Sequence, residues 1–344
     1  MHRIVIHRAG GYDRLKLEEH PDPLPAAGQV TVEVEAAGVN YADVAVRMGL
    51  YSSAQKYVGW PITPGFELAG RVAERGDGAS RFEVGQEVFG VTRFGGYASR
   101  VAVPERQLFS RPRTLTTQQA AGFPTVFLTA HYALFELTRP GPGYSVLVHS
   151  AAGGVGGALT QLAHAAGCRV VGVVGAAHKA EHVRELGADH VVVKHRGELE
   201  WREVEAVERS GFDAVFDANG VSTLRQSYRH LRPTGRLVVY GFHSMLPRTG
   251  GKPRWGKLVL DWLRTPRFSP LDMTEHNRSV LAFNLSHLFE KAELLQELMG
   301  DLVGRLEKGE IRAPRVTAYP MEQVARAHEA LESGQTVGKL ILIP

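Results

Sequence analysis

The stretch from residue 145 to residue 175 constrains this chain more than any other. A short apolar run at 146–148 leads into a glycine cluster, and a helical period follows in which Val155, Leu159 and Leu162 share one face. Gly167 suits the end of that helix, and a second apolar run covers 169–174. This order of strand, glycine turn, helix and strand predicts one βαβ unit with a right-handed crossover.

The glycine turn has the spacing of a dinucleotide-binding fingerprint, with alanine in place of its first glycine. It reads Ala151-x-Gly153-x-x-Gly156, with Gly154 and Val155 between the last two glycines. Gly153 lets the backbone approach a pyrophosphate, Gly156 lets helix and strand pack closely, and the helix N-terminus offers N–H groups to phosphates. Because the turn lies between two strands, it predicts nucleotide binding; an ordinary glycine-rich turn is the alternative.

Length and composition predict a cytoplasmic globular protein of two domains. The 344 residues exceed one core of ordinary size, and 44% apolar with 22% charged residues is typical of soluble enzymes. A single cysteine, Cys168, excludes an internal disulfide and a cysteine-rich metal site. The net charge of +4 permits anionic ligands without indicating nucleic acid. The sequence shows neither a signal-like N-terminus nor an apolar run of membrane-spanning length.

The chain changes character near Thr116, a suitable helix N-cap. Before it, short strands (3–8, 15–19 and 29–38) and frequent glycine turns predict a small barrel, with a helix from Asn40 to Met48. After it, strands alternate with helices, which predicts a doubly wound parallel sheet. The expected strands there are 190–193, 213–217, 236–240 and 279–284, and the expected helices are 128–137, 176–186, 223–231 and 293–308. A strand at 337–343 would close the barrel, so the first domain is expected to be discontinuous.

Several stretches resemble the medium-chain dehydrogenase/reductase superfamily. They are AAGVNYADVAVRMGLY (36–51), PITPGFELAGRV (61–72), FGGYA (94–98), HSAAGGVGG (149–157), FDANG (216–220) and GRLVVYG (235–241). PTVFLTAHYALF (124–135) and HNRSVLAFNLSHLF (276–289) resemble the quinone oxidoreductases related to vesicle amine transport protein. The resemblance implies an α/β chain: a GroES-like β-barrel domain (1–122 and 290–344) on a Rossmann domain (123–289), with the active site in the cleft between them.

The residues that would hold a catalytic metal are replaced. Zinc enzymes of this superfamily take ligands from a cysteine and from a Gly-His-Glu motif, where this chain has Asn40 and Phe66. Phenylalanine cannot bind zinc, and an amide is a poor zinc ligand. The sequence therefore predicts no metal. Without a Lewis acid we expect reduction of an electrophilic quinone or enone rather than alcohol oxidation.

The resemblance also implies the active-site residues. It places Asn40 and Tyr51 near the nicotinamide, where either side chain could donate a hydrogen bond to a forming oxyanion. The alternatives are that Asn40 only caps its helix and that Tyr51 only packs. Asp43, Thr125 and Phe127 are expected around the substrate pocket, Asp43 mainly in an architectural role.

The expected cofactor is NADPH rather than NADH. The second strand ends at Val174-Gly175 without the carboxylate that holds the ribose diol of NAD. The resemblance gives phosphate binding to Lys179 and places Lys194 nearby; a solvated surface charge is the alternative for each. Where relatives bring an arginine, this chain has Gly334. Further cofactor contacts implied by the resemblance are Asn219, Gly241 and Phe283.

An insertion at 247–267 leaves the function open. It carries six basic residues against one acid, Asp261, together with Trp255 and Trp262. The leading hypothesis is an NADPH-dependent reductase of quinones or α,β-unsaturated ketones, with the insertion as a solvated lid. A second is a trans-acting enoyl-thioester reductase, whose insertion would face an acidic carrier protein or a coenzyme A phosphate. A third is a nucleotide-binding, membrane-associated protein, because aromatic and basic residues together suit a membrane surface.

The apolar strand expected at 279–284 predicts a homodimer. It should form the edge of the parallel sheet, and an exposed edge invites pairing with a second copy.

Overall fold

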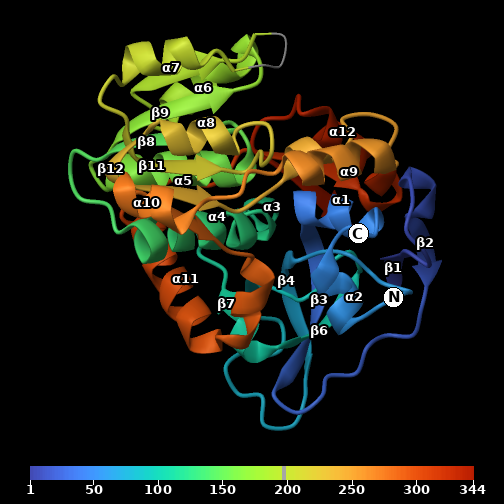
Figure 1. Ribbon diagram of the computed structural model, residues 1–344. Coiled ribbons are helices and arrows are strands. Elements are labelled where there is room, and N and C mark those ends of the chain that lie inside the picture. Colours follow the sequence, from blue (N-terminus) through green and yellow to red (C-terminus); the bar gives the residue numbers. More distant parts are fainter. Residues whose placement is uncertain (196–198) are drawn as a thin grey trace.

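The structure is a computed structural model that describes residues 1–195 and 199–344. Two large sheets organise the chain (Figure 1), and a short antiparallel pair of β1 (His2–Val5) and β2 (Lys16–Glu19) lies beside the second. In the view of Figure 1 the parallel sheet, green to yellow, lies above the blue strands of the N-terminal sheet. This arrangement agrees with the two architectures expected from the sequence.

The parallel sheet has six strands in the order β10-β9-β8-β11-β12-β13, so it is doubly wound as predicted. From β8 the chain adds strands toward one edge, and from β11 it adds them toward the other, so the strand order reverses between β8 and β11. Folds of this kind bind ligands at that point, outside the carboxyl ends of the strands. Its strands are β8 (Ser145–Val148), β9 (Arg169–Val174), β10 (His190–Val193), β11 (Phe212–Asp217), β12 (Leu231–Val239) and β13 (Ser279–Ala282).

The central βαβ unit is confirmed in detail. Helix α5 (Gly154–Ala165) follows β8, with Gly153 as its N-cap, and Gly167 leaves it at φ +75°, as an αL glycine does. A Cβ on Gly156 would lie 2.2 Å from the backbone oxygen of Ser150. Only glycine therefore permits the close packing of α5 on the turn, which is the role that the fingerprint predicts.

The helices of the Rossmann half differ from expectation in several places. Those at 201–207, 255–264 and 270–275 were not expected, and the helix expected at 176–186 is divided after Lys179. The helix expected at 128–137 begins earlier, as α4 at Pro124, and continues as a π-helical segment, η3 (Tyr132–Thr138). Proline suits a first helical turn because its missing N–H has no partner there in any case. The other elements are α3 (Thr117–Ala121), α4 (Pro124–His131), η4 (Ala177–Lys179), α6 (Ala180–Glu185), α7 (Trp201–Val207), α8 (Leu224–Arg229), α9 (Trp255–Arg264) and α10 (Pro270–Glu275).

The second sheet has the order β14-β15-β3-β4-β5-β7, with β6 paired to β3. The C-terminal strand β15 pairs antiparallel with β3, so the chain end returns to the N-terminal sheet, as the sequence led us to expect. The exact domain boundaries stay a prediction. The strands are β3 (Gln29–Val39), β4 (Glu67–Arg75), β5 (Glu87–Val91), β6 (Arg100–Pro104), β7 (Leu108–Ser110), β14 (Val316–Pro320) and β15 (Lys339–Ile343). The helices are α1 (Tyr41–Arg47), α2 (Ser52–Tyr57), α11 (Ala292–Glu307) and α12 (Val324–Ser333).

The C-terminal segment also runs along the fingerprint turn. Gly153 and Gly338 form a parallel bridge, and the N–H of Gly338 donates to the backbone oxygen of Ala152 at 2.8 Å. The two sheets therefore meet beside the first turn of α5, which places the fingerprint at their junction. Within the described residues, no helix is both long and apolar enough to cross a bilayer.

The edge strand β13 generates a test of the predicted dimer. The N–H of Phe283 donates inward to the backbone oxygen of Val239, and the direction alternates along a strand, so the N–H of Ala282 points outward. Ala282→Pro removes this outward donor without removing an inward bond. We expect wild type to be a dimer at micromolar concentration and Ala282→Pro to be a monomer, by gel filtration with light scattering.

Ala282→Ser is the matched control and should remain dimeric. A monomeric wild-type protein at micromolar concentration would contradict the prediction.

Candidate active site

The fingerprint turn presents its backbone at the junction of the two sheets. Gly153, Gly154 and Val155 are half-buried, whereas Ala151 is fully buried and its N–H donates to the backbone oxygen of Val173 at 3.0 Å. Gly153 contributes no side-chain cap, so the first N–H groups of α5 have no partner within the helix. This is the geometry that binds a pyrophosphate at a helix N-terminus.

Asn219 offers a second donor at the same edge of the sheet. It follows β11, and Asp217 holds it in place by accepting its backbone N–H at 2.8 Å. The side-chain oxygen of Asn219 accepts from the hydroxyl of Ser150 at 3.1 Å. Its Nδ2 is buried without a partner among the described residues. A buried amide donor without a partner is costly, so a bound ligand is the expected acceptor.

Gly241 and Phe283 lie at the carboxyl ends of the next two strands, as expected for cofactor contacts. A Cβ on Gly241 would lie 2.9 Å from the backbone oxygen of Ala218. The ring of Phe283 packs against Tyr132, with centroids 5.0 Å apart. Their cofactor role stays a prediction.

His149 lies beneath this edge as a buried neutral side chain. Burial lowers the pKa of His149 to about 4, although the carboxylate of Asp217 opposes the shift. The hydroxyl of Ser227 donates to Asp217 at 2.8 Å, so it accepts from Nε2–H of His149 at 3.0 Å. His149 therefore supports the strand ends rather than exchanging protons with a ligand.

Asn40 belongs to a buried network that also contains an ion pair. Its Nδ2 donates to Glu67 at 2.9 Å, and its Oδ1 accepts from the ammonium of Lys339. Lys339 also lies 2.7 Å from the carboxylate of Glu67, whose other oxygen accepts the backbone N–H of Thr125 at 2.8 Å. Because both ends of the Asn40 amide are engaged, Asn40 is better suited to hold this network than to donate to an oxyanion.

The position expected for a zinc ligand is filled by packing. Phe66 is 3% exposed and packs on Phe94, with ring centroids 5.1 Å apart, and on Tyr51 at 5.6 Å. Within the described residues, no group of three or more His, Cys, Asp and Glu side chains could hold a metal ion. The ammonium of Lys339 supplies the positive charge between Asn40 and Glu67.

Tyr51 lies where the two halves of the molecule meet. Its hydroxyl donates to Oδ1 of Asn284, just after β13, at 3.0 Å. A neighbouring pair of hydroxyls, Ser53 and Ser286, joins the same segments at 3.0 Å. Burial raises the pKa of Tyr51, so the phenol stays protonated and remains a donor.

The three residues expected around the substrate pocket have different surroundings. Asp43 is fully buried and accepts the N–H groups of Asn40 and Gly65 at 2.8 and 2.7 Å, which is the architectural role expected. Burial raises the pKa of Asp43 to about 7. The hydroxyl of Thr125 is buried without a partner among the described residues. Phe127 was expected on a pocket wall, but it is 1% exposed.

Phe127 instead stacks on Phe123, with ring centroids 4.1 Å apart, inside the hydrophobic core. Its sequence neighbours lie at the junction, but its own side chain points into the apolar layer under α4. We therefore do not assign Phe127 to the pocket.

The two lysines expected at the cofactor phosphate are placed differently. Lys179 is 6% exposed, and its ammonium donates to the backbone oxygens of Gly334 and Thr336 at 2.6 and 2.8 Å. It therefore anchors the C-terminal loop, and a phosphate would have to compete with two carbonyls. Lys194 instead lines a cavity, and its phosphate role stays a prediction.

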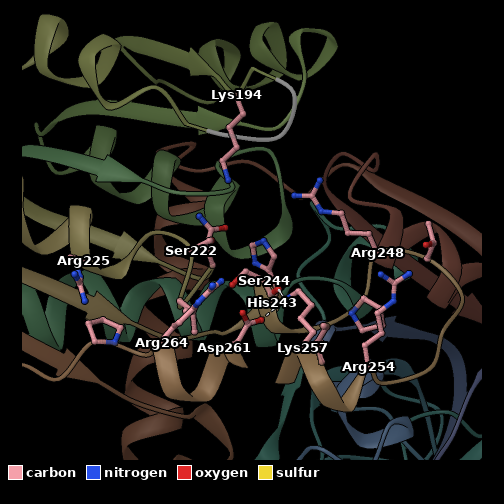
Figure 2. A pocket seen from close by; sticks show the side chains of 16 residues that line it. Lys194, Ser222, Arg225, His243, Ser244, Arg248, Arg254, Lys257, Asp261 and Arg264 are labelled. Atoms are coloured by element: carbon pink, nitrogen blue, oxygen red, sulfur yellow. Dashed lines mark hydrogen bonds and ion pairs between the residues drawn. The ribbon is translucent and has the colours of Figure 1, made fainter. Parts of the chain in front are cut away.

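This cavity has a volume of about 790 Å³, and we call it the basic cavity (Figure 2). It adjoins the carboxyl ends of β10, β11 and β12 and is covered by α9 of the insertion. Lys194, Asn219, Val221, Ser222, Arg225, His243, Ser244, Leu246, Pro247, Arg248, Thr249, Arg254, Lys257, Asp261, Arg264 and Pro266 line it.

The sequence signals for some of these residues were incomplete. The excess of basic residues in 247–267 was visible, but not which of them face the cavity. Lys339 stood out only as a lone charge before an apolar strand, and nothing local indicated its pairing with Glu67.

Comparison with known proteins identifies the family. The zinc-binding dehydrogenase family model matches residues 186–342, and the alcohol dehydrogenase GroES-like domain matches residues 26–113. The synaptic vesicle membrane protein VAT-1 homolog of Rattus norvegicus is 34% identical over 344 residues, covering 99% of this chain and 83% of that protein. The chain belongs to the medium-chain dehydrogenase/reductase superfamily. Within it, the chain lies in the quinone oxidoreductase and VAT-1-like group.

Solved structures of this superfamily have the same fold. Escherichia coli quinone oxidoreductase, complexed with NADPH, superposes with a TM-score of 0.86 at 28% identity, with 100% of both chains covered. The CurK enoyl reductase superposes with a TM-score of 0.83 at 26% identity, covering 99% of this chain and 98% of that chain.

The buried network generates a stability test. Lys339→Met leaves the carboxylate of Glu67 buried without its cation, and Glu67→Gln leaves the ammonium without its anion. Breaking a buried pair from one side costs about 3–5 kcal/mol. We expect each single variant to lose that much unfolding free energy in urea, and the double variant to lose much less than the sum.

Arg184→Met is the control, because its pair with Glu181 is exposed and contributes about 1 kcal/mol or less. Additive losses in the double variant would show that the two groups do not stabilise each other.

Proposed function

We propose that the chain is an NADPH-dependent reductase that delivers hydride to a quinone or an α,β-unsaturated ketone without a catalytic metal. The observation that carries this proposal is the gathering of unpartnered donors at the carboxyl edge of the parallel sheet. The first N–H groups of α5, the amide of Asn219 and the ammonium of Lys194 all lie along it. The NADPH-bound relative supports the choice of cofactor. A cytoplasmic location belongs to the same proposal.

The residues present fit a bound dinucleotide. NADPH would supply the hydride, and the protein orients and polarises. The N–H groups of α5 would hold the pyrophosphate, and Asn219 would donate to the ribose or phosphate oxygens beside it. Gly241 and Phe283 shape the edge near the nicotinamide half. Both polar ends of the Asn40 amide are held in the buried network, whereas the hydroxyl of Tyr51 donates only to Asn284 across the junction. A bound acceptor would have to replace only that one bond, so Tyr51 is the better donor to the developing oxyanion.

The ammonium of Lys339 disfavours a catalytic metal at this site. Its ammonium contacts both Asn40 and Glu67, so a divalent cation there would face an adjacent positive charge. A quinone or enone accepts hydride readily, and one hydrogen-bond donor to its oxygen suffices. Alcohol oxidation would need a lowered pKa of the alcohol, which a metal normally provides.

The acceptor could also be a thioester. The CurK enoyl reductase has the same fold, and enoyl thioesters share the conjugated carbonyl. A free enone and an enoyl-coenzyme A share the conjugated C=C–C=O unit, but the carbonyl is a ketone in the first and a thioester attached to the carrier in the second. The ratio of their kcat/KM values therefore decides between the two acceptors.

A second candidate function is attachment to a membrane surface through α9. The helix presents apolar side chains outward, and Trp255, Trp262 and Leu263 are 65%, 67% and 67% exposed. Arg267 follows this helix and does not line the basic cavity, and basic residues favour anionic lipid. The relative named a synaptic vesicle membrane protein supports this candidate. Attachment would be peripheral and compatible with the reductase.

The reductase is tested by NADPH oxidation with a small quinone and with a free enone, in the presence of a metal chelator. We expect steady turnover that the chelator does not reduce. Tyr51→Phe should lower kcat about ten-fold with the affinity for NADPH unchanged. This is less than the loss of about 10²–10³ for an oxyanion donor in a preorganised site, since quinones are reactive.

Asn284→Ala is the matched control, because it removes the partner of Tyr51 but keeps the hydroxyl. It should retain most of the activity. An equal fall in kcat in both variants would mean that the Tyr51 hydroxyl acts by joining the two halves of the molecule through Asn284. A rate that the chelator reduces would overturn the proposal that no metal takes part.

The membrane candidate is tested by flotation with vesicles of phosphatidylcholine, with and without phosphatidylserine. We expect binding to the anionic vesicles only, and Leu263→Asp should abolish it by placing a charge on the apolar face. Leu24→Asp makes the same change at a leucine that is 81% exposed and remote from α9 in sequence, and it should bind like wild type. Equal binding of Leu263→Asp and wild type would reject α9 as the attachment site.

A further inference from the structure

The basic cavity has an excess of positive charge that nothing in its lining balances. Six of its lining side chains are lysine or arginine, and Asp261 is the one carboxylate among them. Asp261 pairs with Lys257 one turn away on α9. In the part of the chain that the structure describes, the other five have no ion-pair partner; they are Lys194, Arg225, Arg248, Arg254 and Arg264.

Converging like charges are unfavourable unless an anion binds between them. The cations come from separate elements: Lys194 follows β10, Arg225 lies on α8, Arg248 precedes α9, and Arg254 and Arg264 flank or end it. In Figure 2, Lys194 and Arg248 reach into the cavity from different walls. Burial lowers the pKa of Lys194, and the nearby charge of Arg248 lowers it further, while the carboxylate of Asp217 opposes the shift in part. The fold therefore holds these two groups near each other against their repulsion.

Two buried polar atoms without partners point into the same region. Asn219 is 0% exposed with its Nδ2 unpartnered, and the hydroxyl of Ser244 is also buried without a partner among the described residues. Both residues line the cavity. A ligand that carries oxygen acceptors would satisfy both donors, which is the second indication of an anionic, oxygen-rich occupant.

The cavity lies where the adenosine half of a dinucleotide is expected. In this fold the residue at the end of the second strand meets the adenosine ribose, about 20 residues past the fingerprint. Here that strand, β9, ends at Val174, and the backbone N–H of Lys194 donates to the oxygen of Val174 at 2.9 Å. The backbone of Lys194 therefore lies beside the expected position of the ribose 2′ oxygen.

We propose that the basic cavity binds the 2′-phosphate of the adenosine half of NADPH, held between Lys194 and Arg248. The insertion thereby contributes a positive charge that selects NADPH over NADH, while Lys179 anchors the C-terminal loop. This inference rests on the proposed function. The volume of about 790 Å³ suits a ligand of nucleotide size. Arg248 can form bidentate hydrogen bonds to a phosphate, and Lys194 adds a point charge.

Another nucleotide could supply a similar phosphate. Coenzyme A carries its phosphate on the 3′ oxygen of the ribose, so the same cations could face it. The commercial fragments 2′,5′-ADP and 3′,5′-ADP represent the two cases, and 5′-AMP represents NADH. Comparing the three fragments separates the source of the phosphate from adenosine binding as such.

The experiment is isothermal titration calorimetry of the full chain with each fragment. Wild type should bind 2′,5′-ADP more tightly than 3′,5′-ADP and 5′-AMP. Arg248→Ala and Lys194→Ala should each weaken 2′,5′-ADP binding about ten-fold or more, since a charge-assisted hydrogen bond is lost. Their affinity for 5′-AMP should change by less than about two-fold, because AMP carries no 2′-phosphate to lose. Arg248→Lys should restore part of the loss.

Arg267→Ala is the matched control, because it removes the same charge from the same insertion but does not line the cavity. It should bind all three fragments like wild type. The proposal is overturned if Arg267→Ala loses as much as Arg248→Ala, if the variants lose 5′-AMP equally, or if 3′,5′-ADP binds best. If wild type binds and oxidises NADPH while both variants bind 2′,5′-ADP normally, the phosphate site is rejected and the proposed reductase function is retained. If wild type neither binds nor oxidises NADPH, the reductase fails as well.

Discussion

The buried ion pair of Lys339 and Glu67 ties together the parts of the molecule that form the site. Lys339 begins the last strand, Glu67 begins β4, Asn40 caps α1, and Thr125 is the second residue of α4. Each of these elements would otherwise leave a buried polar group without a partner, which costs more than the bond itself contributes. The pair therefore fixes where the C-terminal strand meets the fingerprint turn, and so the shape of the junction between the sheets.

Much of the fold followed from local patterns. The βαβ unit was predictable because a glycine turn between two apolar runs leaves few alternatives. Glycine is required at 156 because a Cβ there would lie 2.2 Å from the backbone oxygen of Ser150. The helix expected at 128–137 misses the first residues of α4, because proline at 124 is compatible with a helix only in its first turn. The expectation covered most of the second half but did not show that its hydrogen bonding becomes π-helical from Tyr132. A sequence window shows the apolar face of such a segment but not the change of hydrogen bonding within it.

The site was less predictable because its contacts join distant positions. Lys179 donates to Gly334, 155 residues away, and Lys339 reaches Asn40 across 299 residues. A lysine next to a fingerprint looks the same in sequence whether its ammonium faces a phosphate or two carbonyls. For Asn40 the position was predictable from the resemblance, while its role depended on which neighbours the fold brought to its amide.

Helix α9 shows how the two faces of the insertion depend on each other. None of its residues is buried, and a helix of ten residues is marginal without packing. Its polar face turns toward the cavity, where Lys257 donates to the backbone oxygen of Ser244 at 2.5 Å, so its apolar residues are left outside. An anion that draws Arg254 and Arg264 inward would stabilise this orientation by the charges it neutralises. An apolar surface against Trp262 would stabilise the same orientation from outside, so each contact favours the other through α9.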